Sequence, residues 1–271
     1  MQLFSSWTGG DFLLVYTMLL GLATFAAWWV PAHLREPGRR GESDDLESIA
    51  LLAGGRRRMA DSLLADLYVR GGLVPCEKGR LAVVQRDLPA SPAGRALLAN
   101  NAPLSLSDAY KAVLGDADRV AARLRRAGLL LRPEQQARLR WLSITPLAAL
   151  FMLGLYRQRA GSTAGEPTGF LVVLLIVTVV LAVIRFARID PRTAAGVAIV
   201  KDLRAQNGRS ARAPRAEEAA LAVALFGTAV LVGTPWEPVH AMRKKDGDGD
   251  GGDSDGDGGS GCGGGCGGCG G

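Results

Sequence analysis

The residues best able to do chemistry gather at the end of this 271-residue chain, where three of its four cysteines form a C-x3-C-x2-C pattern: Cys262, Cys266 and Cys269. Accessible thiols on glycine linkers are substrates for oxidation, lipidation or enzymatic modification, and three together could chelate a soft metal ion. A closed tetrahedral metal site needs a fourth ligand, which the pattern does not supply. The alternative is a low-complexity tail with incidental thiols, which the scarcity of cysteine elsewhere disfavours.

An acidic block precedes the cysteines and has part of a calcium-binding pattern. Asp246, Asp248, Asp250 and Gly251 match the start of an EF-hand loop, with Asp257 at the twelfth position where glutamate is usual. The glycine run that follows cannot form the second helix of such a motif. We expect weak, non-specific divalent binding at most, in a tail (residues 246–271) whose composition predicts disorder.

The rest of the chain offers no catalytic constellation. It contains no GxxxxGK, GxSxG or HExxH motif. His33 and His240 are interpreted as interfacial residues, and Cys76 as a small core residue rather than a nucleophile. We therefore predict a non-enzymatic protein that uses no cofactor.

The chain has three long apolar segments, which would anchor its polar parts: Phe12–Val30, Leu142–Tyr156 and Gly169–Phe186. Nineteen helical residues span roughly 28 Å, which matches the hydrocarbon core of a bilayer. A cleaved signal peptide is the alternative for the first segment, but no basic residue precedes it. The segments predict three transmembrane helices, the last two forming a hairpin.

Arginines predict the orientation. They follow the first apolar segment, precede the second and follow the third, so all three clusters share one side if the N-terminus is outside. The formal net charge of +6 also suits anionic lipid headgroups. We predict a multi-pass protein of the bacterial cytoplasmic (inner) membrane, with its N-terminus outside and membrane lipid as a partner.

A fourth apolar stretch, Ala219–Thr234, fits this topology poorly. If it spanned the membrane, the basic residues that follow it (Arg243, Lys244 and Lys245) would lie outside. We expect a helix packed on the domain or lying at the interface. The alternative, a fourth span, would place the tail outside the cell.

The chain between and after these segments predicts a mainly α fold. Two helices, over 44–53 and 56–70, precede a short hairpin over 73–84, which is a winged-helix-like α+β pattern. Helices over 108–114 (capped by Ser107) and 116–127 and an extended segment 129–131 would form a degenerate second copy. The predicted divisions are an N-terminal anchor (1–30), a basic cytoplasmic domain (31–141), the transmembrane hairpin (142–186), a basic segment with a short apolar helix (187–245) and the tail.

Arg119, Arg123 and Arg126 share one face of a predicted helix, as in a basic DNA-recognition helix. A solvated face beside anionic lipid explains the same pattern and is commoner. Few aromatic or amide side chains are placed to read bases, so binding of nucleic acid is the less favoured interpretation.

Several motifs together resemble a family of uncharacterised bacterial membrane proteins that end in glycine- and cysteine-rich tails. The motifs are ALLAGGRRRMADSLLADLYVRGGL, RRAGLLL, GEPTGFLVV, DPRTAAG and ALFGTAVL. The resemblance implies an architecture and no activity. Our first hypothesis is a membrane protein that displays a thiol-bearing tail for a partner, a metal or a modifying enzyme, and the alternative is a membrane-tethered regulator that binds DNA or protein.

Overall fold

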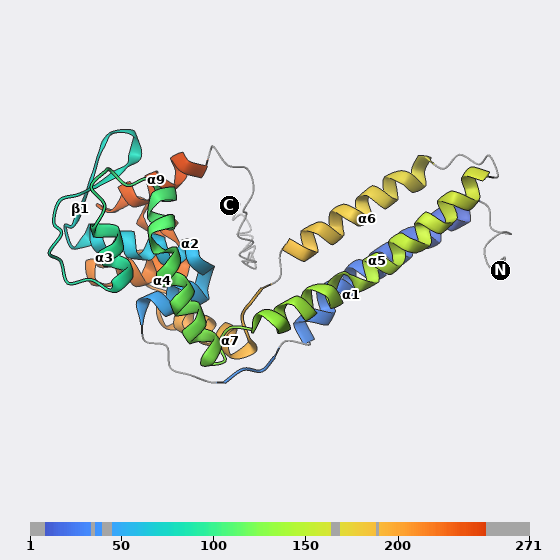
Figure 1. Cartoon of the computed structure of the whole chain (residues 1–271), viewed down its shortest axis with the longest axis horizontal. Helices are drawn as coiled ribbons and strands as arrows, with labels where there is room; N and C mark the ends of the chain where they lie inside the picture. The colour runs from blue at the N-terminus through green and yellow to red at the C-terminus, as the bar shows by residue number, and fades with distance from the viewer. Residues whose placement is uncertain (1–8, 34–35, 40–44, 164–168, 188–189, 248–271) are drawn as a thin grey trace, which may run out of the picture.

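The structure, a computed structural model, describes residues 9–33, 36–39, 45–163, 169–187 and 190–247. Within this part of the chain it is mainly helical, with one two-stranded sheet. A long bundle of three helices meets a helical domain at one end (Figure 1).

The bundle consists of the three apolar helices that the sequence predicts: α1 (Gly9–His33), α5 (Pro133–Thr163) and α6 (Gly169–Ala187). Each is long and apolar enough to cross a membrane. α5 begins well before the predicted Leu142, and Pro146 lies inside it without ending it. Proline is tolerated in membrane helices because neighbouring groups compensate for the lost hydrogen bond.

A buried hydrogen bond and a glycine lie where the three helices contact one another. The hydroxyl of the fully buried Tyr16 in α1 lies 3.1 Å from Thr178 Oγ1 in α6. A Cβ added to Gly154 of α5 would lie 2.7 Å from Leu175 Cδ2 and 2.9 Å from Tyr16 Cε2. Small residues permit such close helix contacts in lipid. The core around this contact is otherwise apolar.

The helical domain is built around α2 (Leu46–Val69), which is buried along most of its length. α4 (Leu106–Arg126) and α8 (Ala219–Phe226) pack against it, and α3 (Pro92–Leu98) packs on α4. One hydrophobic core includes side chains from 49–130 and from 195–242. Chain segments on both sides of the α5–α6 hairpin therefore share this core.

The segment expected to form two short helices after residue 107 is one helix, α4. Ser105 rather than Ser107 caps it: the Ser105 hydroxyl accepts from the Asp108 amide (3.2 Å) and donates to the Asp108 carboxylate (2.6 Å). The hydrogen bonds that the Ser105 hydroxyl and the Ser105 backbone amide donate to the Asp108 carboxylate hold the pKa of Asp108 below its usual range. The helix runs through Gly115 because a continuous apolar stripe packs on α2, and this outweighs glycine's cost of about 1 kcal/mol. The stripe comprises Val113, Ala117, Val120 and Leu124.

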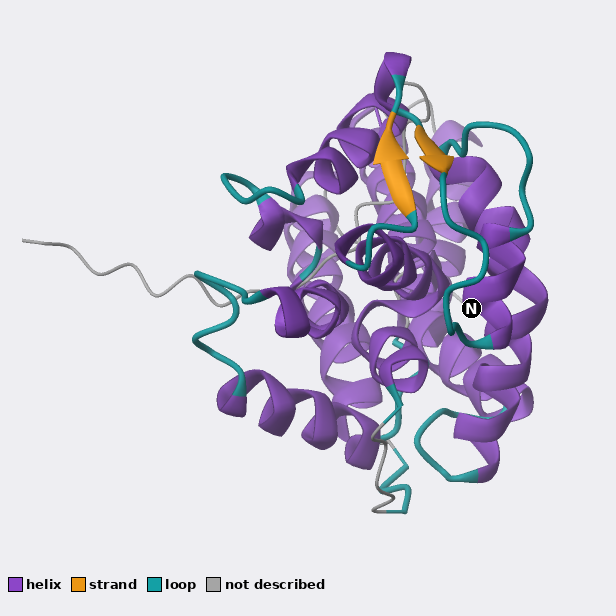
Figure 2. Cartoon of the chain, turned by 90° about the vertical axis from the view of Figure 1, so that its left-hand side faces the viewer, coloured by secondary structure: helices purple, strands orange, loops and turns teal. Residues whose placement is uncertain are grey.

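The predicted hairpin is present as strands β1 (Leu73–Pro75) and β2 (Leu81–Val83), which pair antiparallel with Leu73 opposite Val83. A 3-10 turn, η1 (Glu77–Gly79), connects them, and Gly79 adopts the positive φ (69°) that the turn requires. Figure 2 shows the two strands as a minor element among helices.

The fourth apolar stretch packs on the domain, as the sequence predicted. α8 has only eight residues, and most of its side chains are buried against α2. It ends at Gly227, and the short 3-10 helices η2 (Ala216–Glu218) and η3 (Thr228–Leu231) flank it. The last helices of this half are α7 (Ala194–Gln206) and α9 (Glu237–Gly247).

Three connectors between bundle and domain are tied to one another. The Thr193 hydroxyl lies 2.9 Å from the Gly128 carbonyl oxygen, and the Leu131 amide donates to the Pro191 carbonyl at 2.8 Å. The Ala194 amide donates to the Glu36 carbonyl at 2.9 Å, which adds the connector from α1. RRAGLLL and DPRTAAG, two motifs of the resemblance, thus meet at this junction.

Candidate functional site

The break in α2 makes room for a buried arginine. Gly54 and Gly55 have non-helical backbone angles, and Gly55 adopts a φ of 74° with a ψ of −164°, which strongly favours glycine. A Cβ on Gly54 would lie 2.8 Å from Arg58 Cβ, and one on Gly227 would lie 2.9 Å from Arg58 Nη1. Arg58 is only 9% exposed. Glycines from two distant motifs therefore enclose one guanidinium group.

The enclosed guanidinium lies at the C-terminal end of α8. Arg58 Nη1 is 3.5 Å from the Val223 carbonyl oxygen, and the Gly227 amide donates to that same carbonyl at 2.8 Å. A cation at this position interacts favourably with the negative end of the helix dipole. Arg58 thus helps to join α8 to α2.

One turn after Arg58, a buried carboxylate joins α2 to α9. Asp61 is 2% exposed and accepts a hydrogen bond of 2.6 Å from Arg243 Nη1. Charge-assisted bonds of this length are among the stronger protein hydrogen bonds. Because Arg243 lies near the end of α9, this bond fixes the helix just before the tail begins.

Two further contacts hold α9 in the same position. His240 Nδ1 lies 3.1 Å from the hydroxyl of the buried Thr228 in η3. Val239 and Met242 are both almost fully buried in the domain core. The helix therefore presents a mixed apolar and polar face, and we call the contacts of Val239, His240, Met242 and Arg243 the α9 clasp.

The α9 clasp attaches α9 to the rest of the domain. Its two polar side chains have partners on other elements, His240 on η3 and Arg243 on α2, and no group of three or more potential metal ligands occurs among the described residues. Sequence inspection missed Arg58, Asp61 and Arg243 as partners in this region. The available signals were the glycine pair before the RRR triplet and the lone glycine in ALFGTAVL.

The arginines predicted as a basic surface lie on the solvent side of α4. Arg119 pairs with Asp116 at 3.0 Å, Arg123 lies 3.6 Å from an Asp45 carboxylate oxygen, and Arg126 Nε contacts the Ala122 carbonyl at 3.4 Å. The shared face predicted from their spacing is present. Acidic neighbours reduce its net positive charge.

The tail residues singled out from the sequence fall mostly outside the described part of the chain: Asp248, Asp250, Asp257, Cys262, Cys266 and Cys269. The backbone of Asp246 lies in the last turn of α9.

The remaining cysteine, Cys76, follows β1 and is partly buried. It lines a shallow cavity of about 410 Å³ together with Arg80 and the start of α9 at Glu237. The expectation of a small core residue is therefore met only in part, because Cys76 lies at the edge of the domain.

Comparisons of the chain with family models, with curated proteins and with solved structures found no match.

Proposed function

We propose that this chain is a non-enzymatic integral membrane protein that displays a thiol-bearing C-terminal tail from a fixed point on a membrane-anchored domain. The observation that carries the proposal is the buried bond between Arg243 and Asp61, because it ties the helix that leads into the tail to the central helix of the domain. The tail then begins at a defined place on the domain.

The proposed location is the bacterial cytoplasmic membrane, with the N-terminus outside and the domain in the cytoplasm. In support, the domain lies at the end of the bundle where α1 ends, α5 begins and α6 ends (Figure 1), and the connectors there are rich in arginine. Cytoplasmic loops carry an excess of Lys and Arg. The packing of α8 on the domain adds no fourth span, so the tail would lie in the cytoplasm.

The proposed role of Cys262, Cys266 and Cys269 is to present thiols to a protein partner, a soft metal ion or a modifying enzyme. Their glycine linkers favour an extended peptide that can enter an enzyme's pocket, and their motif context resembles the family with glycine- and cysteine-rich tails.

Two measurements on the native protein test this role. In a Cys76→Ser background, a membrane-impermeant maleimide should leave intact cells unlabelled and should react, only after permeabilisation, with those tail thiols that are free. Intact-mass analysis of the untreated protein should show a modification or a bound metal that disappears when the three tail cysteines are replaced by serine. Three unmodified thiols with no metal would contradict the metal and modification versions of the proposal, and labelling in intact cells would contradict the topology.

The second candidate is a membrane-tethered regulator with a winged-helix-like domain. It is favoured by the β1–β2 hairpin that follows the broken helix α2, and by the exposed Arg119 and Arg123. The test uses the full chain, because residues from 195–242 complete the domain core. Binding to duplex DNA that weakens with salt would support the DNA version, and no binding at low salt would exclude it.

A further inference from the structure

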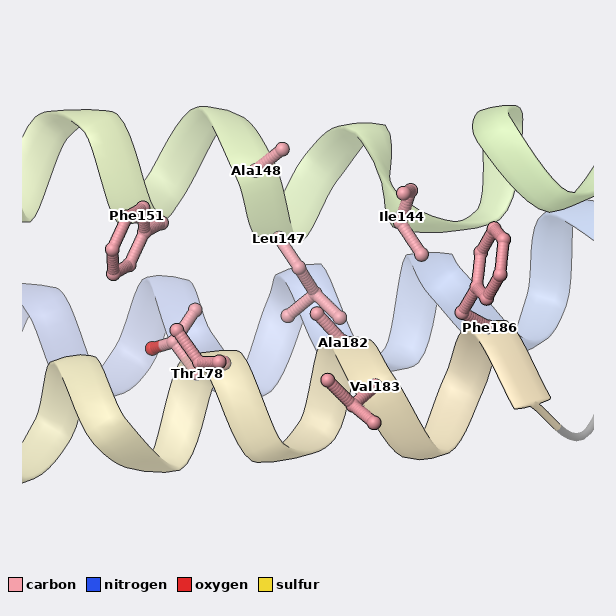
Figure 3. Close-up of a pocket in the computed structure, with 9 residues that line it drawn as sticks. Ile144, Leu147, Ala148, Phe151, Thr178, Ala182, Val183 and Phe186 are labelled. Carbon is pink, nitrogen blue, oxygen red and sulfur yellow. The ribbon is translucent and has the colours of Figure 1, made fainter.

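An apolar groove runs between α5 and α6 on the surface of the bundle. It has a volume of about 310 Å³, within the range of ligand pockets, and Figure 3 shows it lined by side chains of both helices. From α5 come Ile144, Leu147, Ala148 and Phe151, and from α6 come Thr178, Val179, Ala182, Val183 and Phe186.

The single polar lining group of the groove already has its partners. The Thr178 hydroxyl donates to the Leu174 carbonyl oxygen at 2.8 Å, so the Tyr16 hydroxyl is the donor in the bond between Tyr16 and Thr178. The groove therefore offers no polar group of its own to a ligand and suits a hydrocarbon chain.

The end of the groove nearest the domain carries a positive charge. The guanidinium carbon of Arg140 lies 5.4 Å from the centre of the Phe186 ring, which lines the groove. Arg140 Nε is buried, and among the described residues no group accepts a hydrogen bond from it. A buried donor without an acceptor is costly, so the Arg140 side chain gains if it turns toward a ligand that supplies one.

A second arginine and two tryptophans mark the same end as the membrane interface. Arg185 Nε donates to the Ala27 carbonyl at 2.7 Å, and its guanidinium lies 5.7 Å from the Trp28 ring centre. Trp141 contacts the Phe186 ring edge-on at 6.4 Å. Tryptophan is enriched at the headgroup level of membranes, and arginine side chains near helix ends extend to the same level.

We propose that this groove binds an anionic phospholipid of the domain-side leaflet, with one acyl chain between α5 and α6 and the phosphate at Arg140. An acyl chain matches the apolar lining, and a phosphate oxygen supplies the acceptor that Arg140 Nε lacks among the described residues. A transmembrane helix of a second copy would cover the apolar lining but would bring no acceptor, since its own carbonyl groups are used within the helix.

Lipid titration of the full-length protein in detergent, followed by native mass spectrometry, tests this site. The probes are phosphatidylglycerol and phosphatidylcholine with identical acyl chains. The wild-type protein should bind phosphatidylglycerol more tightly. Arg140→Gln should weaken that binding by about five-fold, which is the effect of about 1 kcal/mol per arginine near the surface. Binding of phosphatidylcholine should not change.

Two further variants separate the groove from general electrostatics. Arg138→Gln removes an exposed arginine from the same helix and should leave the lipid preference as it is. Ala182→Phe should fill the groove and weaken both lipids, with Ala148→Phe as a second filling variant if the first loses helical content.

Three outcomes would overturn the proposal. The first is equal binding of both lipids by the wild-type protein, and the second is an equal effect of Arg138→Gln and Arg140→Gln. The third is a dimer that Ala182→Phe disrupts while phosphatidylglycerol binding persists, because the groove would then be an interface between copies.

Discussion

The helical domain and the membrane bundle treat polar groups in opposite ways. The domain buries Arg58 and Asp61 and uses them to hold α8 and α9. The bundle keeps its arginines at the helix ends against aromatic rings, as with Arg157 above Phe12 at 5.6 Å and Arg185 beside Trp28. A charge at the centre of a bilayer loses its water of hydration and finds few groups that compensate for the loss, whereas a domain core can enclose an ion pair.

This difference indicates separate structural roles for the two regions. The domain contains the specific contacts that fix α9, and with it the start of the tail. The bundle is held mainly by apolar packing. Among its described residues, the side chains of Tyr16 and Arg185 add hydrogen bonds between helices, and an apolar groove remains on its surface. Four substitutions test whether the division holds.

Asp61→Ala should have the largest effect. It leaves Arg243 without its buried partner. Because the Arg243 side chain is itself 34% exposed, we expect a loss of about 3 kcal/mol, the lower end of the range for breaking fully buried pairs. Thermal unfolding of the full-length protein in detergent, followed by circular dichroism, measures the loss. Asp118→Ala is the matched control because its pair with Arg56 is exposed and should contribute about 0–1 kcal/mol. Equal losses of stability in both variants would mean that the buried pair contributes no more than the exposed pair.

Gly154→Leu should destabilise the bundle by about 1–3 kcal/mol, because the added side chain overlaps Leu175 and Tyr16. The same substitution at Gly21 of α1 is the control, since a Cβ there meets no neighbour within 4 Å. Unfolding by sodium dodecyl sulfate compares the two. A loss at Gly21 as large as at Gly154 would contradict the close packing of the three helices.

Tyr16→Phe should have a smaller effect, about 0.6 kcal/mol, the average for interhelical hydrogen bonds in membranes. The exposed Tyr156 provides the control for the same chemical change. A loss as large as that of Asp61→Ala, with both variants measured by thermal unfolding, would remove the contrast between the two regions.

Glu47→Gln should give the smallest change, and one confined to a pH range. Burial raises the pKa of Glu47, which the Ser91 hydroxyl partly offsets. Below the unfolded-state pKa of about 4.3, Glu47 is protonated in both the folded and the unfolded protein, so its ionisation does not reduce the stability of the fold. As the pH rises, the unfolded state ionises first and the folded state loses stability.

The substitution should therefore raise the melting temperature at pH 7 and leave it unchanged below pH 4. Glu134→Gln, at an exposed position in the first turn of α5, should show no such pH dependence. A gain for Glu47→Gln that persists unchanged at low pH would rule out ionisation as its cause.

Local sequence patterns predicted the helices and the hairpin, but they could not predict contacts between residues far apart in the sequence. The apolar segments gave the three long helices, and the glycines around Leu73–Val83 gave the hairpin, because each signal lies within a few residues. The prediction of Ser107 as the cap of α4 is wrong, as is the prediction of a new helix at Asp116. The packing of α4 on α2 makes it one continuous helix, and the local sequence does not show this packing. Asp61 and Arg243 lie far apart in sequence, so nothing local pairs them.

The most direct test of the central claim is amide hydrogen exchange of α9, residues 237–247, in the full-length protein. If the buried bond to Asp61 fixes the base of the tail, these amides exchange slowly in the wild-type protein and in Asp118→Asn. They should exchange much faster in Asp61→Asn while the centre of α2 stays protected. Equally fast exchange in all three proteins would show that α9 is not held, and the account would be wrong.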